Sequence, residues 1–125
     1  MHSLKIVNTF KEPSVNLDFQ KGKFEISGNC IPEDPDKIFR PITDWFHQNM
    51  SQIQDLKLEL KFNYINSSSS RAVVRLLKNI EQYQIEDRNM LIMWYSDSED
   101  DRDHCRFIAS CTSIPFQIVT NKETE

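Results

Sequence analysis

Residues 56–80 read LKLELKFNYINSSSSRAVVRLLKNI, and this stretch decides the fold. Over 56–64 a leucine or an aromatic residue alternates strictly with a lysine, a glutamate or an asparagine. Because successive side chains of a strand point to opposite faces, this alternation predicts a strand with one buried face and one polar face. After Asn66 and four serines the apolar residues recur every three or four positions, at Val73, Val74, Leu77 and Ile80. The change of period predicts a helix that runs to about Tyr83.

Downstream of this pair, the chain continues to alternate between strands and helices. Met90–Tyr95 is an unbroken apolar run of strand length, as expected for a strand covered on both faces. Phe107, Ile108 and Cys111 indicate one face of a helix, and Phe116–Thr120 follows Pro115 as a last strand. Strands that alternate with helices call for parallel pairing with right-handed crossovers.

Upstream, the first third of the chain is predicted to form short strands. Residues 4–10 alternate loosely, whereas 15–19 and 24–26 alternate strictly and are joined by a turn at 20–23. This pattern predicts a β-hairpin, followed by a loop over 28–36.

The first helix is predicted from its capping signals. Asp34 suits the N-cap and Pro35 suits the first turn. One buried face follows at spacings of three and four, made by Ile38, Phe39, Ile42, Trp45 and Phe46. Pro41 falls inside this pattern, so it is expected either to kink the helix or to move its start to about Phe39. Trp45 and Trp94 both lie within apolar patterns and are therefore expected in the core.

The element order is thus β-β-β-α-β-α-β-α-β. It predicts an α/β fold with a mixed sheet, in which antiparallel N-terminal strands precede parallel βαβ units and about three helices. We expect one domain over 1–125, with frayed ends at 1–3 and 121–125.

The composition argues against several classes of function. The net charge is −4 and the basic residues are scattered, which argues against a nucleic-acid partner. No window approaches the roughly 18 apolar residues that a membrane-spanning helix needs, and no export signal is readable. Cys30, Cys105 and Cys111 show no CxxC spacing, so we expect three reduced thiols and a cytoplasmic protein.

The serine run lies where the clearest strand ends and a helix begins, which is where sites cluster in open α/β sheets. Asn66 or Ser67 is the natural N-cap, and the serines on their own need do no more than cap and turn. A phosphorylated serine at this point would be tolerated by the free N–H groups of the first turn. It would also place roughly −1.5 to −2 charge on the surface. Arg71, one turn on, would either pair with the phosphate or point to solvent.

The segment Tyr64-Ile65-Asn66-Ser67-Ser68-Ser69-Ser70-Arg71-Ala72 resembles the central motif of the SiaC family of regulatory phosphoproteins, small bacterial domains similar to the anti-anti-sigma (STAS) fold. The family pattern is approximately Tyr-aliphatic-Asn-Thr-Ser-Ser before a helix. The resemblance extends over nearly the whole chain, through Gly28, Pro32-Glu33, the Trp45 helix, Trp94-Tyr95 and Ile114-Pro115-Phe116.

This resemblance implies a phosphoacceptor directly after the motif asparagine, which is Ser67 here, with Ser68 as the alternative acceptor. It implies modification by a Ser/Thr kinase and restoration by a PP2C-type phosphatase. The unphosphorylated form would bind and activate a diguanylate cyclase, linking the chain to c-di-GMP signalling and biofilm control. The partner-binding loop would be formed by Tyr64, Asn66, Ser67, Ser68, Ser69 and Arg71. The chain departs from the family pattern by carrying serine rather than threonine at the acceptor and a fourth serine at position 70.

Three other functions are weighed against this one. A serine hydrolase is disfavoured because there is no GxSxG elbow, and neither His47 nor His104 has a visible link to Ser67. The acidic stretch 97–103 fits a solvated helix start better than a calcium loop, although weak cation binding or a partner contact stays open. No catalytic residue, metal or cofactor is predicted. The remaining alternative is a constitutive adaptor, or an anti-anti-sigma-type domain that sequesters a partner without a phospho-switch.

Overall fold

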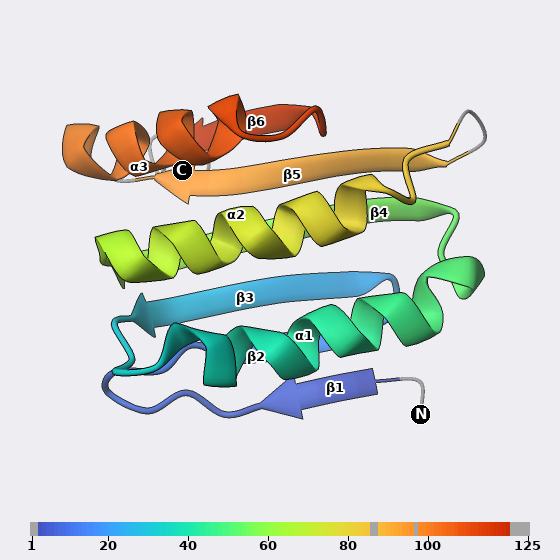
Figure 1. Ribbon diagram of the computed structural model, residues 1–125, viewed down its shortest axis with the longest axis horizontal. Coiled ribbons are helices and arrows are strands. Elements are labelled where there is room, and N and C mark those ends of the chain that lie inside the picture. The colour runs from blue at the N-terminus through green and yellow to red at the C-terminus, as the bar shows by residue number, and fades with distance from the viewer. Residues whose placement is uncertain (1–2, 86–87, 97, 121–125) are drawn as a thin grey trace.

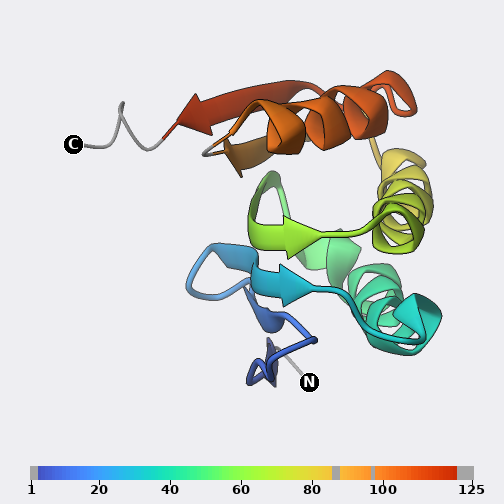
Figure 2. The same ribbon diagram turned by 90° about the vertical axis from the view of Figure 1, so that its left-hand side faces the viewer.

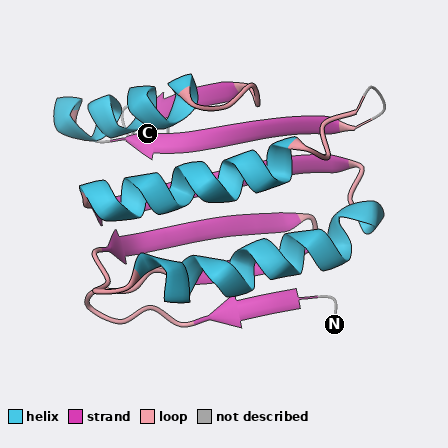
Figure 3. Ribbon diagram, viewed as in Figure 1, coloured by secondary structure: helices cyan, strands magenta, loops and turns pink. Residues whose placement is uncertain are grey.

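The computed structural model describes residues 3–85, 88–96 and 98–120. Its elements, in chain order, are β1 (Ser3–Ile6), β2 (Ser14–Asp18), β3 (Lys23–Cys30), α1 (Pro35–Asn49), the 3-10 helix η1 (Met50–Gln52), β4 (Asp55–Ile65), α2 (Ser67–Glu81), β5 (Asn89–Ser96), α3 (Glu99–Ser110) and β6 (Phe116–Thr120). Figure 1 shows them along the chain, and Figure 3 distinguishes helices from strands.

The six strands form one sheet in the order β1-β2-β3-β4-β5-β6. The pairs β1–β2 and β2–β3 are antiparallel, whereas β3–β4, β4–β5 and β5–β6 are parallel. The three α-helices that connect the parallel strands all lie against the same face of the sheet (Figures 1 and 2). The predicted fold class, with its antiparallel N-terminal strands, parallel βαβ units and three helices, is confirmed.

The core lies between the sheet and this helical layer. Its largest fully buried side chains come from the central strands and from the helices above them, and include Leu58, Leu60, Trp94, Phe46 and Leu77. Trp45 is 5% exposed and Trp94 is 0% exposed, so the expectation that both tryptophans are core residues is confirmed.

Strand β4 departs from the predicted alternation at its end. Leu56 to Phe62 bury every second side chain, but Tyr64 is 65% exposed and Ile65 is buried. The pairing with β3 explains the change, because Gly28 lies opposite Phe62 while the next residue, Asn29, lies opposite Tyr64. One extra residue of β4 is therefore accommodated as a bulge, which exchanges the two faces of the strand beyond it. The prediction that Tyr64 lies on the buried face was wrong.

Two boundaries near the N-terminus also differ from the predictions. Strand β1 ends at Ile6, and Val7 and Phe10 beyond it are exposed. Strand β3 continues to Cys30, so the predicted loop over 28–36 shortens to the residues before Pro35. Gly28 makes this continuation feasible, since its φ of +103° is a conformation that other residues rarely adopt. The hairpin of β2 and β3 is confirmed.

Helix α1 begins at Pro35 and contains Pro41, so a start near Phe39 is excluded. Pro41 removes one backbone N–H from the helix, but it lies on the exposed face. Water can therefore satisfy the carbonyl group that lacks its usual donor. The predicted buried face is confirmed at Phe39, Ile42, Trp45 and Phe46.

The buried face of α3 is rotated relative to the prediction. Cys105 and Ile108 are buried, whereas Phe107 is 48% exposed and Cys111 is the C-cap residue. Because α3 packs near one edge of the sheet, it buries a narrow stripe, and Phe107 falls outside it. Ser3 lies in β1, while 1–2 and 121–125 are outside the described residues.

Candidate functional site

The site lies at the edge of the sheet where β3, β4 and β5 end and α2 and α3 begin (Figure 1). Ile65, the last residue of β4, pairs with Cys30 of β3, and the backbone N–H of Asn66 donates to the Cys30 carbonyl oxygen at 3.4 Å. The start of α2 is therefore joined to the middle of the sheet. The β4 bulge turns the ring of Tyr64 outward beside it.

Asn66 is the N-cap of α2, one of the two predicted capping residues. Its Oδ1 accepts a hydrogen bond from the backbone N–H of Ser69 at 2.9 Å and another from the hydroxyl of Ser68 at 3.2 Å. The Asn66 carbonyl oxygen also accepts from the N–H of Ser70 at 2.9 Å. This cap makes Ser67 the first residue of the helix.

The four serines occupy different environments. Ser67 is exposed and its hydroxyl makes no hydrogen bond with any other described residue. Ser68 is half-buried and its hydroxyl is engaged by Asn66. Ser69 and Ser70 are 0% and 2% exposed. Of the serines, Ser67 alone therefore combines exposure with a hydroxyl that is not engaged within the part of the chain that the structure describes.

The two buried serines face neighbouring elements. Ser69 lies next to the Cys30 thiol; burial raises the pKa of that thiol to about 11, and a contact with Ser69 lowers it slightly. Ser70 reaches the other way, and its hydroxyl forms a 3.0 Å hydrogen bond with Nδ1 of His104 on α3. Ser70 thus joins α2 to α3, whereas the buried Ser69 hydroxyl makes no hydrogen bond with a described residue at normal distance and angle.

Helix α3 is positioned by its own cap and by a contact with the sheet. Ser98 Oγ accepts from the N–H of Asp101 at 3.2 Å, which confirms a capped helix start for the part of the acidic stretch that the structure describes. The Trp94 indole N–H donates to Oδ2 of Asp101 at 3.3 Å. These contacts hold His104 above the start of α2. Asp97 is outside the described residues.

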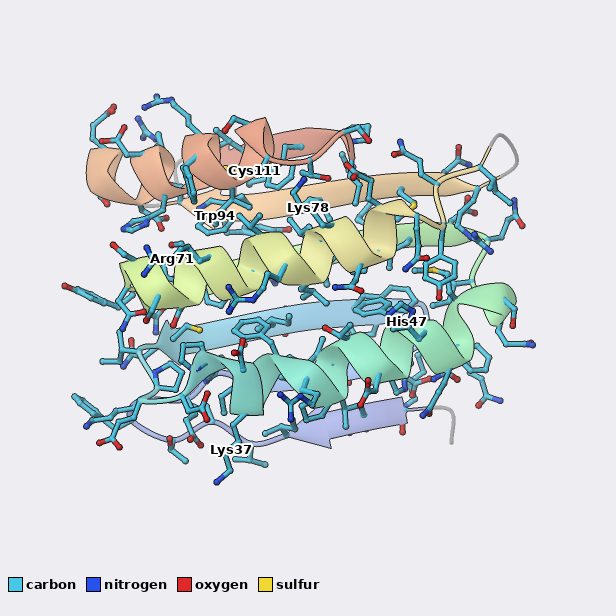
Figure 4. The ribbon with its side chains drawn as sticks, in the orientation of Figure 1. Lys37, His47, Arg71, Lys78, Trp94 and Cys111 are labelled. Atoms are coloured by element: carbon cyan, nitrogen blue, oxygen red, sulfur yellow. The ribbon has the colours of Figure 1, made fainter. Side chains whose placement is uncertain are left out.

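A pocket of about 710 Å³ opens between these elements. Strand β4 contributes Asn63, Tyr64 and Ile65, and α2 contributes Ser67, Ser70 and Arg71. The opposite wall is made by Ser98, Asp101, Asp103, His104 and Phe107. Arg71 lies at the N-terminal end of α2 (Figure 4) and makes no ion pair with any other described residue. Of the predicted site residues, the pocket brings together Tyr64, Ser67 and Arg71, while Asn66, Ser68 and Ser69 support the turn.

The sequence of this chain is similar to known proteins along most of its length. It matches the profile described as SiaC family regulatory phosphoprotein over residues 6–121. The chain belongs to the SiaC family. An uncharacterized protein of Pseudomonas aeruginosa (strain UCBPP-PA14) is 27% identical over 126 residues, covering 98% of this chain and 100% of that protein.

Solved SiaC structures have the same fold. Apo-SiaC from Pseudomonas aeruginosa matches with a TM-score of 0.84 at 27% identity, covering 95% of this chain and 99% of that chain. The crystal structure of the diguanylate cyclase SiaD in complex with its activator SiaC, from the same organism, matches with a TM-score of 0.83 at 26% identity, covering 94% and 99%. The SiaC resemblance inferred from the serine motif is confirmed.

Sequence reasoning placed neither His104 nor Phe107 at this pocket. His104 was set aside because no local pattern relates it to the serines, and its contact with Ser70 is tertiary. Phe107 was assigned to the buried face of α3, although it borders the pocket. The sequence signal that places His104 near the sheet is its spacing of four residues from Ile108, which is buried.

The Ser70–His104 pair has the composition of a nucleophile and a base, but its surroundings do not suit catalysis. Ser70 is almost fully buried, and its backbone N–H is already bonded to the Asn66 carbonyl, so it cannot stabilise an oxyanion. His47, the other described histidine, contacts Tyr83 and Asn79 near the C-terminal end of α2. Within the described residues, no three potential metal-ligating side chains gather, and no helix is long and apolar enough to cross a membrane.

Proposed function

We propose that this chain is a cytoplasmic phospho-switch that binds and activates a diguanylate cyclase while Ser67 is unmodified. A Ser/Thr kinase phosphorylates Ser67 and a PP2C-type phosphatase removes the phosphate, so that the cyclase, and through it c-di-GMP and biofilm formation, is controlled reversibly. The kinase brings its own ATP and magnesium, and the chain itself needs no cofactor. The whole described fold acts as one binding domain.

The observation that carries the proposal is the state of Ser67 in a member of the SiaC family. Its hydroxyl is exposed at the first residue of a helix, beside a pocket, and makes no hydrogen bond within the described residues, whereas the other three serines of the run are engaged or buried. A kinase needs a hydroxyl that it can reach, and the helix start tolerates the added charge. The solved complex of a related SiaC with the cyclase SiaD supports a cyclase as partner.

The surface around Ser67 suits a charge-controlled interface. Tyr64 and Phe107 are 65% and 48% exposed on two sides of the pocket. Exposed aromatic side chains are frequent anchors of protein interfaces, where they pack against the partner and lose water. A phosphate between them would bring roughly −1.5 to −2 charge into a surface that must be desolvated, which opposes binding without unfolding the chain.

The switch is tested by measuring the affinity of the chain for its cognate cyclase by calorimetry. We expect Ser67→Glu to weaken binding by about tenfold or more, equivalent to about 1.4 kcal/mol, because the new charge is desolvated at the interface. Ser51→Glu, which adds the same charge at an exposed position outside the pocket, serves as the matched control and should bind like the wild type. Equal affinities for all three proteins would favour the constitutive adaptor.

The acceptor is identified separately with the kinase. We expect Ser67→Ala to abolish phosphate incorporation and Ser68→Ala to retain it, because the Ser68 hydroxyl is held by Asn66. Phosphate mapping by mass spectrometry distinguishes the two. Labelling lost in Ser68→Ala and kept in Ser67→Ala would assign the switch to Ser68 instead.

A further inference from the structure

The pocket beside Ser67 contains two side chains suited to binding a phosphoryl group, and they come from different helices. Arg71 lies four residues after Ser67, so the two side chains share one face of α2, and both line the pocket. His104 lines it from α3. Arginine binds phosphate through two parallel N–H donors, and histidine contributes a further donor when its second nitrogen is protonated.

Arg71 differs from the other arginines around it in having no carboxylate partner among the described residues. Arg75 lies one turn further along α2, and its guanidinium is 2.7 Å from Oδ1 of Asp36. The guanidinium of Arg106 is 2.9 Å from Oδ1 of Asp103. His104 is oriented by its bond from Nδ1 to Ser70, and its Nε2 makes no hydrogen bond with another described residue. Donors from both helices therefore remain available at the rim on which Ser67 lies.

The pocket also contains carboxylates, which oppose the binding of a phosphate, so the two donors must contact the phosphate directly. Among the described residues, the titratable and charged side chains that line it are Tyr64, Arg71, Asp101, Asp103 and His104. Both carboxylates already accept from other groups, Asp101 from Trp94 and Asp103 from Arg106. They repel a phosphate but do not occupy Arg71, whose guanidinium can make direct charge-assisted hydrogen bonds.

We propose that the pocket receives the phosphoryl group of phosphorylated Ser67 within the same chain, with Arg71 as its main partner and His104 as a second donor. The phosphate then bridges α2 and α3 and occupies the part of the pocket that lies beside Ser67. Phosphorylation would thus close the pocket to a partner side chain as well as change the surface charge. This inference rests on the proposed function, because it concerns the modified state of Ser67.

The test uses full-length protein with phosphoserine installed at position 67 during translation, which removes the dependence on a kinase. The pH titration of the phosphate is followed by ³¹P NMR. An unperturbed phosphoserine has its second ionisation at about pH 6, and a cationic partner lowers the pH of that midpoint. We expect the midpoint in the folded protein to lie below that of a phosphoserine peptide. Arg71→Ala should raise it by about one pH unit, and His104→Gln should raise it by less.

Arg75→Ala is the matched control, because Arg75 lies on the same helix but pairs with Asp36 and does not line the pocket. It should leave the midpoint unchanged. Arg71 is exposed, so Arg71→Ala retains the core. A midpoint unaffected by Arg71→Ala and His104→Gln, whether equal to that of the peptide or lowered by the helix start alone, would show that the pocket does not hold the phosphate and would overturn the proposal.

Binding of the same phosphoprotein to the cyclase separates this inference from the proposed function. If cyclase binding is lost while the phosphate midpoint matches the peptide, the pocket does not hold the phosphate, but the switch stands. If Arg71→Ala raises the midpoint as expected while cyclase binding is unchanged, the pocket holds the phosphate, but phosphorylation does not control the cyclase.

Discussion

The amide side chain of Asn66 accepts two hydrogen bonds at the point where β4 ends and α2 begins. Replacing it by alanine leaves the N–H of Ser69 without its cap. We expect Asn66→Ala to lower the free energy of unfolding by about 1 kcal/mol, and Asn66→Asp, which keeps the accepting oxygen, to change it by only a few tenths. Urea denaturation followed by tryptophan fluorescence measures both. Equal losses in the two variants would contradict the assigned cap.

At this residue scale, the sequence predicted where the site lies but could not rank its four serines on physical grounds. The strand-to-helix junction and the capping asparagine follow from local patterns. The burial of Ser69 and Ser70 does not, because it depends on Cys30 of β3 and His104 of α3. Only the family resemblance singled out Ser67, and the structure adds that its hydroxyl is exposed and makes no hydrogen bond with another residue that the structure describes.

At the scale of elements, the bulge in the pairing of β3 with β4 depends on Gly28. Its φ of +103° lies outside the left-handed region that asparagine tolerates, whereas Gly22, at +66°, lies within it. We expect Gly28→Asn to lower the free energy of unfolding by about 1–3 kcal/mol through backbone strain. Gly22→Asn should be close to neutral, because a side chain there meets open space. Similar unfolding midpoints for the two variants in urea would contradict this account of the bulge.

The bulge also explains why element boundaries were less predictable than element types. The alternation over 56–64 continues through Tyr64, and nothing within it indicates that an extra residue is accommodated opposite Gly28. That information lies in the pairing with β3, which is distant in sequence. The same applies to Phe107, whose exposure follows from the position of α3 near the sheet edge.

At the scale of the whole molecule, the three α-helices cover one face of the sheet (Figure 2). The opposite face of β3 and β4 carries charged side chains. An ion-pair network there joins Lys23, Glu25, Glu59 and Lys61, and its shortest distance is 2.7 Å between Lys61 Nζ and Glu25 Oε2. Burial raises the pKa of Glu25, but the hydrogen bond and charge of Lys61, together with Lys23, outweigh it and lower the pKa below 4.5. The layered arrangement was predictable from the order of strands and helices; this network was not.

The lowered pKa of Glu25 predicts how this network responds to pH. A carboxyl group with a lowered pKa in the folded state contributes stability above its ordinary pKa and loses it as pH falls through the lowered value. Lys61→Met should therefore cost up to about 1 kcal/mol at pH 7 and less near pH 3. Lys57→Met is the control, because Lys57 is exposed on the same strand and makes no ion pair among the described residues. It should lower the free energy of unfolding by less at pH 7, and its effect should vary less with pH. Denaturation at both pH values measures the difference, and a cost for Lys61→Met that does not change with pH would contradict the prediction.

The central claim, that modification of Ser67 controls a cyclase, also belongs to the whole molecule, because it requires the fold to persist while the surface changes. The most direct test measures the rate of c-di-GMP synthesis by the cognate diguanylate cyclase mixed with the chain, either unmodified or carrying phosphoserine at position 67. We predict that the unmodified chain raises the rate and that the phosphorylated chain, with the same circular dichroism spectrum, does not. Equal activation by both forms would contradict the account.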